Sequence, residues 1–336
     1  MYTALGSIFI FMLVILLHEL GHFTVAKLVG IKVNEFSIGM GPKLLQKESG
    51  ETKYSLRLLP IGGFVAMEGE EEESDDPRSF SNVSAPKRMA VVIAGVVMNL
   101  ILAIVTFIIL AAMIGVPSNS NTIGSVKADS PAMEADIRSG DKIVEIEGKS
   151  INSWNEIVET ISVKEANQQI SITIERNSEK LIKQVIPVNY EGKSVIGIGF
   201  SKNILSVIKY GFTKTFDVIA EVFSVLKGLF AGGVDLSMLS GPVGLISAIG
   251  QATSTGITSV LFLLGLISAN LAVVNILPIP ALDGGKLVFL LFEWITGKKI
   301  NEKIENALSL AGLVFLFGLM LYVTVFGDLI RLDILG

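Results

Sequence analysis

Residues 89–116 read MAVVIAGVVMNLILAIVTFIILAAMIGV and contain no charged side chain. This run is longer than the roughly 20 apolar residues that a helix needs to cross a bilayer. Three further segments, 1–29, 256–285 and 305–327, are also mainly apolar. The sequence therefore predicts a polytopic α-helical membrane protein with four transmembrane helices.

The composition of the whole chain supports this assignment. Of the 336 residues, 50% are hydrophobic and 18% are charged, whereas soluble domains carry about 25% charged residues. The mean hydropathy is +0.62. A net charge of -5 and the lack of an arginine-rich tract give no reason to expect nucleic acid as a partner.

The segment between the second and third apolar runs has a different character. Residues 121–200 are charged and include alternating stretches such as 170–174, which indicates an inserted soluble α/β domain. Residues 203–231 follow, with Phe212, Phe216, Ile219 and Phe223 at helical spacing. Charged residues interrupt this stripe and argue against a full span. We expect an amphipathic helix at the membrane interface, and packing against the soluble domain is the alternative.

Basic residues indicate how the chain is oriented in the membrane. They gather between Lys27 and Arg88 and again in the connection between the third and fourth apolar runs. Short loops rich in lysine and arginine stay in the cytoplasm. We therefore expect both loops to be cytoplasmic and the domain at 121–200 to lie outside. The acidic run from Glu68 to Asp76 is expected to be a solvated part of the first loop.

The first apolar segment ends in His18-Glu19-Leu20-Gly21-His22. Residues four apart share a face of a helix, so both imidazoles could hold one zinc ion. Glu19 lies beside them and could accept the proton of a water molecule bound to zinc. Ionisable groups at membrane depth are costly and usually mark function. A helix end with polar residues facing water is the simpler alternative.

A third zinc ligand must be a carboxylate, because the chain has no cysteine and no other histidine. Between residues 236 and 285 the only charged side chain is Asp283. It follows Pro278 and Pro280, which break the helix. The charge rule places Asp283 and the histidines at the same, cytoplasmic end of their spans. A loop aspartate in a simple turn is the alternative.

These motifs resemble those of a known family. Residues 18–23 (HELGHF) and 275–284 (NILPIPALDG) are similar to the two signatures of the site-2 proteases, which are intramembrane zinc metalloproteases, and the chain is most similar to the bacterial RseP/RasP type. Residues 59–65 resemble the membrane-associated β-hairpin of that family, within a β region and acidic loop at 30–88. Gly95 and Asn99 resemble its Gly-x-x-x-Asn element. Residues 121–200, with Ser139-Gly140-Asp141, resemble a single PDZ domain.

The resemblance implies a function and a set of site residues. Zn²⁺ would be bound by His18, His22 and Asp283, with Glu19 as the general base. Asn275 would hold the substrate backbone, and the other substrate-binding residues would be Gly62, Gly63, Phe64 and Asn99. The substrates would be single-span proteins of a bacterial cell membrane, such as anti-sigma factors and remnant signal peptides. A peptide or chain end would bind the PDZ-like domain.

Several of these residues also have simpler structural readings. Asn275 could be a polar residue that packs between helices, and Asn99 could hydrogen-bond between helices. Gly62, Gly63 and Phe64 could form an ordinary turn.

Two other classes of protein also fit part of the sequence. A non-catalytic membrane scaffold explains the spans and the PDZ-like domain, and a zinc transporter explains a metal site but needs ligands at more than one depth. The scaffold leaves unexplained why both histidines, Glu19 and Asp283 share one depth, and the chain has no histidines to spare for the further sites of a transporter.

Overall fold

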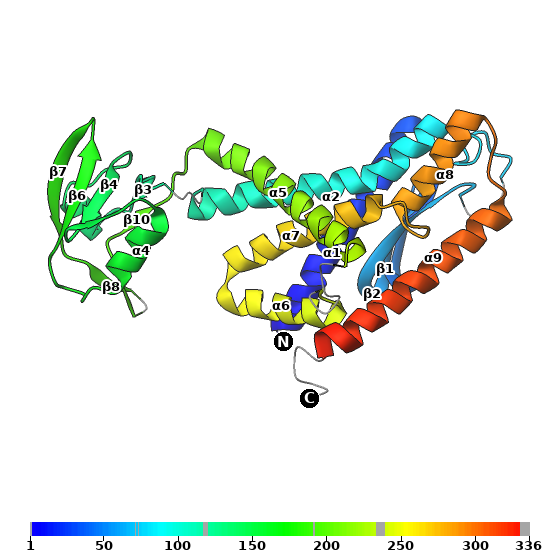
Figure 1. Ribbon diagram of the computed structural model, residues 1–336. Coiled ribbons are helices and arrows are strands. Elements are labelled where there is room, and N and C mark those ends of the chain that lie inside the picture. Colours follow the sequence, from blue (N-terminus) through cyan, green and yellow to red (C-terminus); the bar gives the residue numbers. More distant parts are fainter. Residues whose placement is uncertain are drawn as a thin grey trace. The chain divides into compact units, whose positions relative to one another are not determined.

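The computed structural model describes residues 2–70, 72, 74–116, 120–190, 192–232 and 239–329 (Figure 1). Within these residues, four helical segments are long and apolar enough to cross a membrane: Leu5–Val29, Ala85–Ile114, Ile257–Ile276 and Lys303–Leu329. The prediction of a polytopic helical membrane protein is confirmed. The chain divides into two units, one of residues 1–106 and 214–336 and the other of residues 107–213.

The helices differ from the expected segments at their ends. The first spanning helix is α1 (Tyr2–Val29), and the second is α2 (Ala85–Ile114), which begins before the apolar run. Ser84 starts α2, because its carbonyl accepts hydrogen bonds from the amides of Lys87 and Arg88. Basic residues can thus form the first turn of a spanning helix, a feature that a search for uncharged runs misses.

The third spanning helix, α7 (Ile257–Ile276), is shorter than the expected segment 256–285. A turn over residues 277–282 separates it from α8 (Asp283–Thr296), because Pro278 and Pro280 cannot donate backbone hydrogen bonds. The fourth spanning helix, α9 (Glu302–Tyr322), continues as a π-helical segment, Val323–Leu329. Helix α6 (Pro242–Thr255) precedes α7 and was not expected from the sequence.

The core of the helical unit joins four helices. Ile10 and Val14 of α1 are buried together with Leu102 of α2, Ile249 of α6 and Leu264 of α7. Burying an aliphatic side chain of this size contributes about 1.5–3 kcal/mol. These contacts fix α2, α6 and α7 against α1, the helix that carries both histidines.

A residue distant in sequence caps the first turn of α6. The carboxylate of Asp328 accepts hydrogen bonds from the amides of Gly241 (3.0 Å) and Gly244 (2.8 Å). Asp328 is fully buried, and negative charge is favourable at a helix N-terminus. The π-helical segment that follows α9 is thus tied to the start of α6.

Between α1 and α2 the chain forms two long antiparallel strands, β1 (Val33–Ser49) and β2 (Thr52–Met67). Both strands are bent, so residues 35–38 pair with residues 53–56 on one side and with residues 63–66 on the other. The segment 63–66 pairs only with β1 among the described residues, which leaves its other edge free. The strands cover more of the chain than the expected hairpin at 59–65.

The second unit is a strand-rich α/β module. Its four-stranded antiparallel sheet has the order β5 (Lys149–Ser150), β4 (Lys142–Ile146), β6 (Ile170–Arg176) and β7 (Glu179–Val185). The shorter elements are β3 (Ser125–Val126), α3 (Pro131–Glu134), α4 (Trp154–Ser162), β8 (Val188–Tyr190), β9 (Lys193–Val195) and β10 (Ile198–Gly199). Buried isoleucines form its core.

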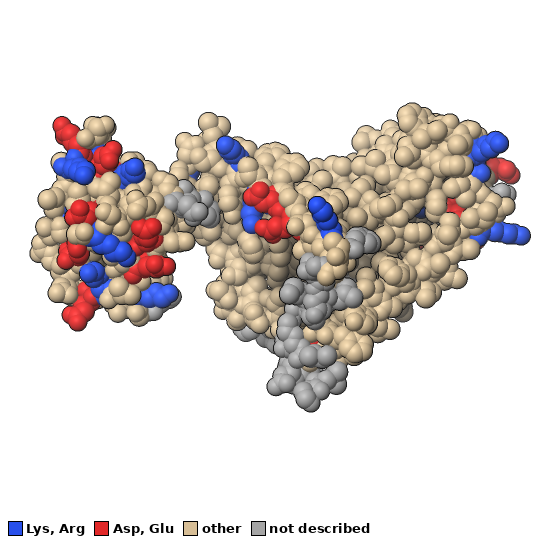
Figure 2. Space-filling model, viewed as in Figure 1, with Lys and Arg blue, Asp and Glu red and all other residues tan. Residues whose placement is uncertain are grey.

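Charged side chains are distributed unequally over the visible face of the protein. Figure 2 shows many of them on the strand-rich module and few over the long helices. Helix α5 (Ile204–Phe230) follows the module and carries the predicted aromatic stripe. Phe212, Phe216 and Phe223 of this stripe are exposed. The prediction that this helix lies at the membrane interface stays a prediction.

Candidate metal centre

The two histidines lie one turn apart on α1 and face the same point. The Nε2 atoms of His18 and His22 are 3.2 Å apart, and the side chains are about nine-tenths buried. Their spacing of four residues on a helix is what places both rings on one face. Two imidazole nitrogens this close and largely shielded from water favour a shared cation over two independent side chains.

Asp283 completes the cluster from a distant part of the sequence. Its Oδ2 atom lies 3.2 Å from Nε2 of His18 and 3.5 Å from Nε2 of His22. The residue stands in the first turn of α8, where the helix dipole favours its negative charge. The turn before α8 is tight, because a Cβ on Gly284 would lie 2.1 Å from the carbonyl oxygen of Leu277. Only glycine allows this approach.

The geometry of these three residues fits a zinc ion. One donor atom of each lies within 4.8 Å of the others, and this trio is the one group of potential metal ligands found among the described residues. The Oδ2 atom of Asp283 is buried without a hydrogen-bond partner in the described structure. Two imidazoles and one carboxylate are a set of protein ligands that catalytic zinc sites use.

Helix α2 lies directly against the histidines. The carbonyl oxygen of Val91 accepts a hydrogen bond from Nδ1 of His22 (2.8 Å), and the side-chain amide of Asn99 lies 3.2 Å from Nδ1 of His18. Gly95 lies between Val91 and Asn99 on α2, and a Cβ at this position would come within 2.4 Å of Nε2 of His22. Asn99, which was predicted to bind substrate, is fully buried in this structure, and its amide contacts His18.

The other predicted site residues contact different parts of the protein. The amide nitrogen of Asn275 is 3.3 Å from Nε2 of His18, so Asn275 borders the candidate metal position. Glu19 is half-buried and faces β2, since a Cβ on Gly63 would lie 3.5 Å from its Cγ atom. The ring of Phe64 stacks under the guanidinium of Arg57 at 4.9 Å.

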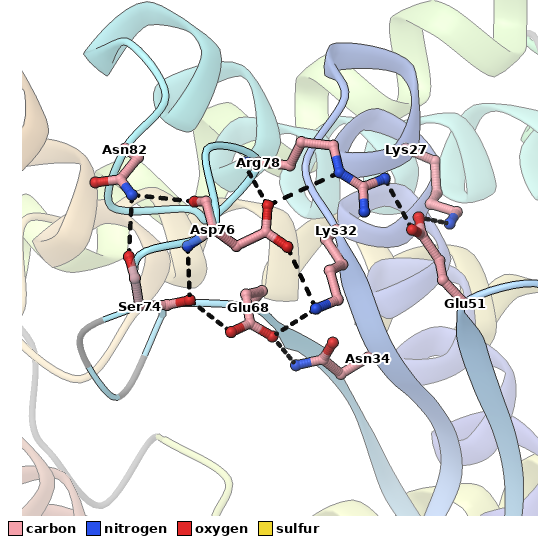
Figure 3. Close-up of polar contacts among 9 residues, drawn as sticks. All are labelled: Lys27, Lys32, Asn34, Glu51, Glu68, Ser74, Asp76, Arg78 and Asn82. Carbon is pink, nitrogen blue, oxygen red and sulfur yellow. Dashed lines mark hydrogen bonds and ion pairs between the residues drawn. The ribbon is translucent and has the colours of Figure 1, made fainter.

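Two carboxylates of the acidic run, Glu68 and Asp76, take part in a network of polar contacts (Figure 3). The carboxylate of Glu68 accepts hydrogen bonds from Ser74 (2.6 Å) and Asn34 (2.8 Å) and pairs with Lys32 (3.3 Å). These contacts lower the pKa of Glu68 to about 2. Lys32 also pairs with Asp76 at 3.3 Å. The network holds the loop after β2 against the chain that follows α1.

The same loop also reaches α8. Glu70 pairs with Lys286, one turn beyond Asp283, at 2.6 Å. Sequence reasoning missed this pair, and it also missed the carbonyl of Val91, because no motif marks either contact. The Gly95-x-x-x-Asn99 spacing was the one visible signal of how α2 meets the histidines.

The comparisons with known proteins place the chain in a family. Residues 6–319 match the profile of peptidase family M50, the site-2 proteases, and the chain belongs to this family. A protein of Clostridium acetobutylicum is 40% identical over 325 residues, which cover 95% of each chain. The regulator of sigma-W protease RasP of Bacillus subtilis is 33% identical, over 98% of this chain and 99% of that protein.

A solved structure is similar to part of the chain. It is the PDZ domain of the SdrC-like protein of Listeria monocytogenes, with 26% identity over 25% of this chain and 88% of that one, and a TM-score of 0.22.

From the family membership, the protein is a zinc-dependent site-2 metalloprotease of a bacterial membrane. Its general activity is regulated intramembrane proteolysis, as the sequence predicted.

Proposed function

We propose that His18, His22 and Asp283 bind the zinc ion and that Glu19 is the general base of an intramembrane endopeptidase. The observation that carries this proposal is the meeting of the three donor atoms within 4.8 Å, although Asp283 comes from a helix far along the chain. A zinc ion bound there would polarise a carbonyl group and make water more acidic. A scaffold function would leave this cluster without a purpose.

Glu19 serves as the proton carrier in this proposal. It follows His18 directly on α1, and its half-buried side chain faces Gly63 of β2. Its carboxylate accepts a proton from the attacking water and passes it to the nitrogen of the leaving amine. Because both transfers use one side chain, the residue must be ionised at the start of each cycle.

The substrate binds along the free edge of β2 at residues 63–66. An intact helix hides its peptide bonds, so the substrate segment unwinds and adds to this edge as an extended strand. A cavity of about 540 Å³ borders the edge and is lined by Phe64–Met67, Asn34 and the acidic loop. Asn275 holds the substrate backbone beside His18, since an amide offers both donors and an acceptor. Gly62 and Gly63, at the start of this edge, contact the substrate through their backbone.

The substrates are membrane proteins with one span and a cytoplasmic N-terminus, such as anti-sigma factors and remnant signal peptides. The basic residues between Lys27 and Arg88 support a cytoplasmic position for the active site and an extracytoplasmic position for the PDZ-like module. The module binds an extended peptide or chain end. The exposed Phe212, Phe216 and Phe223 support interfacial binding of α5 to the bilayer.

The test is the cleavage of a tagged single-span reporter protein in liposomes. Loss of a general base typically lowers the rate by about 10²–10⁴-fold, so Glu19→Gln should lose cleavage by this factor and keep its zinc. Glu221→Gln, on the exposed face of α5, is the matched control and should cleave at the wild-type rate. A zinc chelator should stop the wild type. Cleavage by purified Glu19→Gln at the wild-type rate would refute the assignment.

A further inference from the structure

One face of α2 supplies three groups that surround the proposed histidine ligands. Val91, Gly95 and Asn99 are spaced four residues apart, as are His18 and His22 on α1, so the two series run side by side. Val91 contacts His22, Asn99 contacts His18, and Gly95 lies against both rings. Each imidazole therefore has its second nitrogen, Nδ1, directed at a specific group of α2.

For His22 the contact determines where the ring proton resides. A carbonyl oxygen can only accept, so Nδ1 of His22 donates its hydrogen to Val91. Nε2 of a neutral His22 then carries a lone pair, and this atom faces Asp283. A histidine that binds a metal commonly donates its other ring N–H in this way.

For His18 the orientation of the Asn99 amide is decisive. If the amide nitrogen faces the ring, Nδ1 must accept, Nε2 of the neutral ring carries the hydrogen, and no lone pair is left for a metal. The Asn99 Oδ1 atom is then buried without a hydrogen-bond partner, which is unfavourable because a buried acceptor has lost its water. Turning the amide by half a rotation places Oδ1 against Nδ1–H and gives this oxygen a donor.

The backbone around Asn99 is fixed independently of its side chain. The hydroxyl of Ser268 on α7 donates to the carbonyl oxygen of Asn99 at 2.8 Å, and both residues are fully buried. Helix α7 also carries Asn275, which borders the same histidine. Asn99 is thus positioned by α7 while its amide reaches His18 on α1.

We propose that Asn99 is a positioning residue that accepts the Nδ1 hydrogen of His18 and keeps its Nε2 lone pair directed at the metal position. This inference rests on the proposed ligands His18, His22 and Asp283. It replaces the predicted contact between Asn99 and substrate. Hydrogen-bond partners of this kind typically change metal affinity by about 10- to 100-fold.

The test measures zinc affinity in the full-length protein by competition with a chromophoric chelator. Asn99→Leu has a similar volume but no acceptor, and Asn99→Ala removes the amide with less crowding. Both should bind zinc about 10- to 100-fold more weakly. Asn99→Asp keeps an acceptor for Nδ1–H and should bind close to wild type. With Co²⁺ in place of zinc, the visible spectrum should change in the leucine and alanine variants and not in the aspartate variant.

Asn270→Leu is the matched control, because Asn270 of α7 is an amide whose oxygen is also buried without a partner. Its zinc affinity should equal that of wild type. Wild-type affinity in Asn99→Leu or Asn99→Ala would overturn the inference, and so would weak binding by Asn99→Asp. Failure of the proposed function looks different, because wild type itself would then bind no zinc or His22→Ala would bind as tightly as wild type.

Discussion

Gly95 offers a substitution whose effect can be worked out from distances. A Cβ at this position would lie 2.4 Å from Nε2 of His22 and 2.6 Å from Cε1 of His18, whereas ordinary contacts begin near 3.4 Å. The methyl group of Gly95→Ala must therefore push the imidazoles away by about 1 Å. A displacement of about 1 Å at a catalytic site can lower the rate by about 10²-fold. We expect a loss of this size in reporter cleavage.

The effect on folding should be small by comparison. Alanine favours a helix by about 1 kcal/mol over glycine, and overpacking typically costs about 1–3 kcal/mol. The free energy of unfolding should therefore fall by no more than about 2 kcal/mol, from the difference between these two effects. The loss of activity would then reflect the site rather than unfolding.

The assay compares Gly95→Ala with Gly318→Ala, a second glycine-to-alanine change in a spanning helix. A Cβ on Gly318 would meet no atom within 4 Å, so this control should cleave the reporter at the wild-type rate. Thermal unfolding in detergent should show that both variants remain folded. Wild-type cleavage by Gly95→Ala would refute the close packing of α2 on the proposed ligands.

Two further predictions concern carboxylates outside the metal centre. Asp328→Asn leaves one acceptor oxygen for the buried amides of Gly241 and Gly244, so the free energy of unfolding should fall by about 1–3 kcal/mol. Thermal unfolding beside Asp217→Asn, an exposed control on α5, measures this, and equal midpoints would exclude the capping role. The pKa of Glu68 lies near 2 instead of 4.5, because its carboxylate accepts hydrogen bonds from Ser74 and Asn34 and pairs with Lys32; these contacts therefore stabilise the loop fully above pH 4.5 and are lost as the pH falls toward 2. Glu68→Gln should therefore increase trypsin cleavage at Arg78 at neutral pH, whereas Glu72→Gln should not.

The sequence predicted those parts of the site that depend on local spacing. His18, Glu19 and His22 lie within one helical turn and a half, so their shared face follows from helix geometry alone. Asp283 could be selected because the apolar segment around it offers no other carboxylate. The contact of Val91 with His22 could not be predicted, because every residue has a carbonyl group and only packing selects one.

The fold was predictable where hydropathy dominates and less so where contacts are distant in sequence. Helix α6 was missed because glycines flank it and its cap, Asp328, lies far along the chain. The double pairing of residues 35–38 was missed as well, because alternation in sequence does not show which strands meet. Asn99 was assigned to substrate because its burial depends on how closely α2 approaches α1.

The position of Asp283 so late in the chain has a consequence for how the protein is made. On the proposed ligand set, the ribosome delivers both histidines with the first membrane helix and the third ligand only after the third spanning helix. The cap of α6 arrives later still, with Asp328. A nascent chain therefore lacks a complete zinc site while its early helices enter the membrane. The protease becomes able to cut only when most of its own synthesis is over, so unfinished copies cannot cleave the membrane segments inserted beside them.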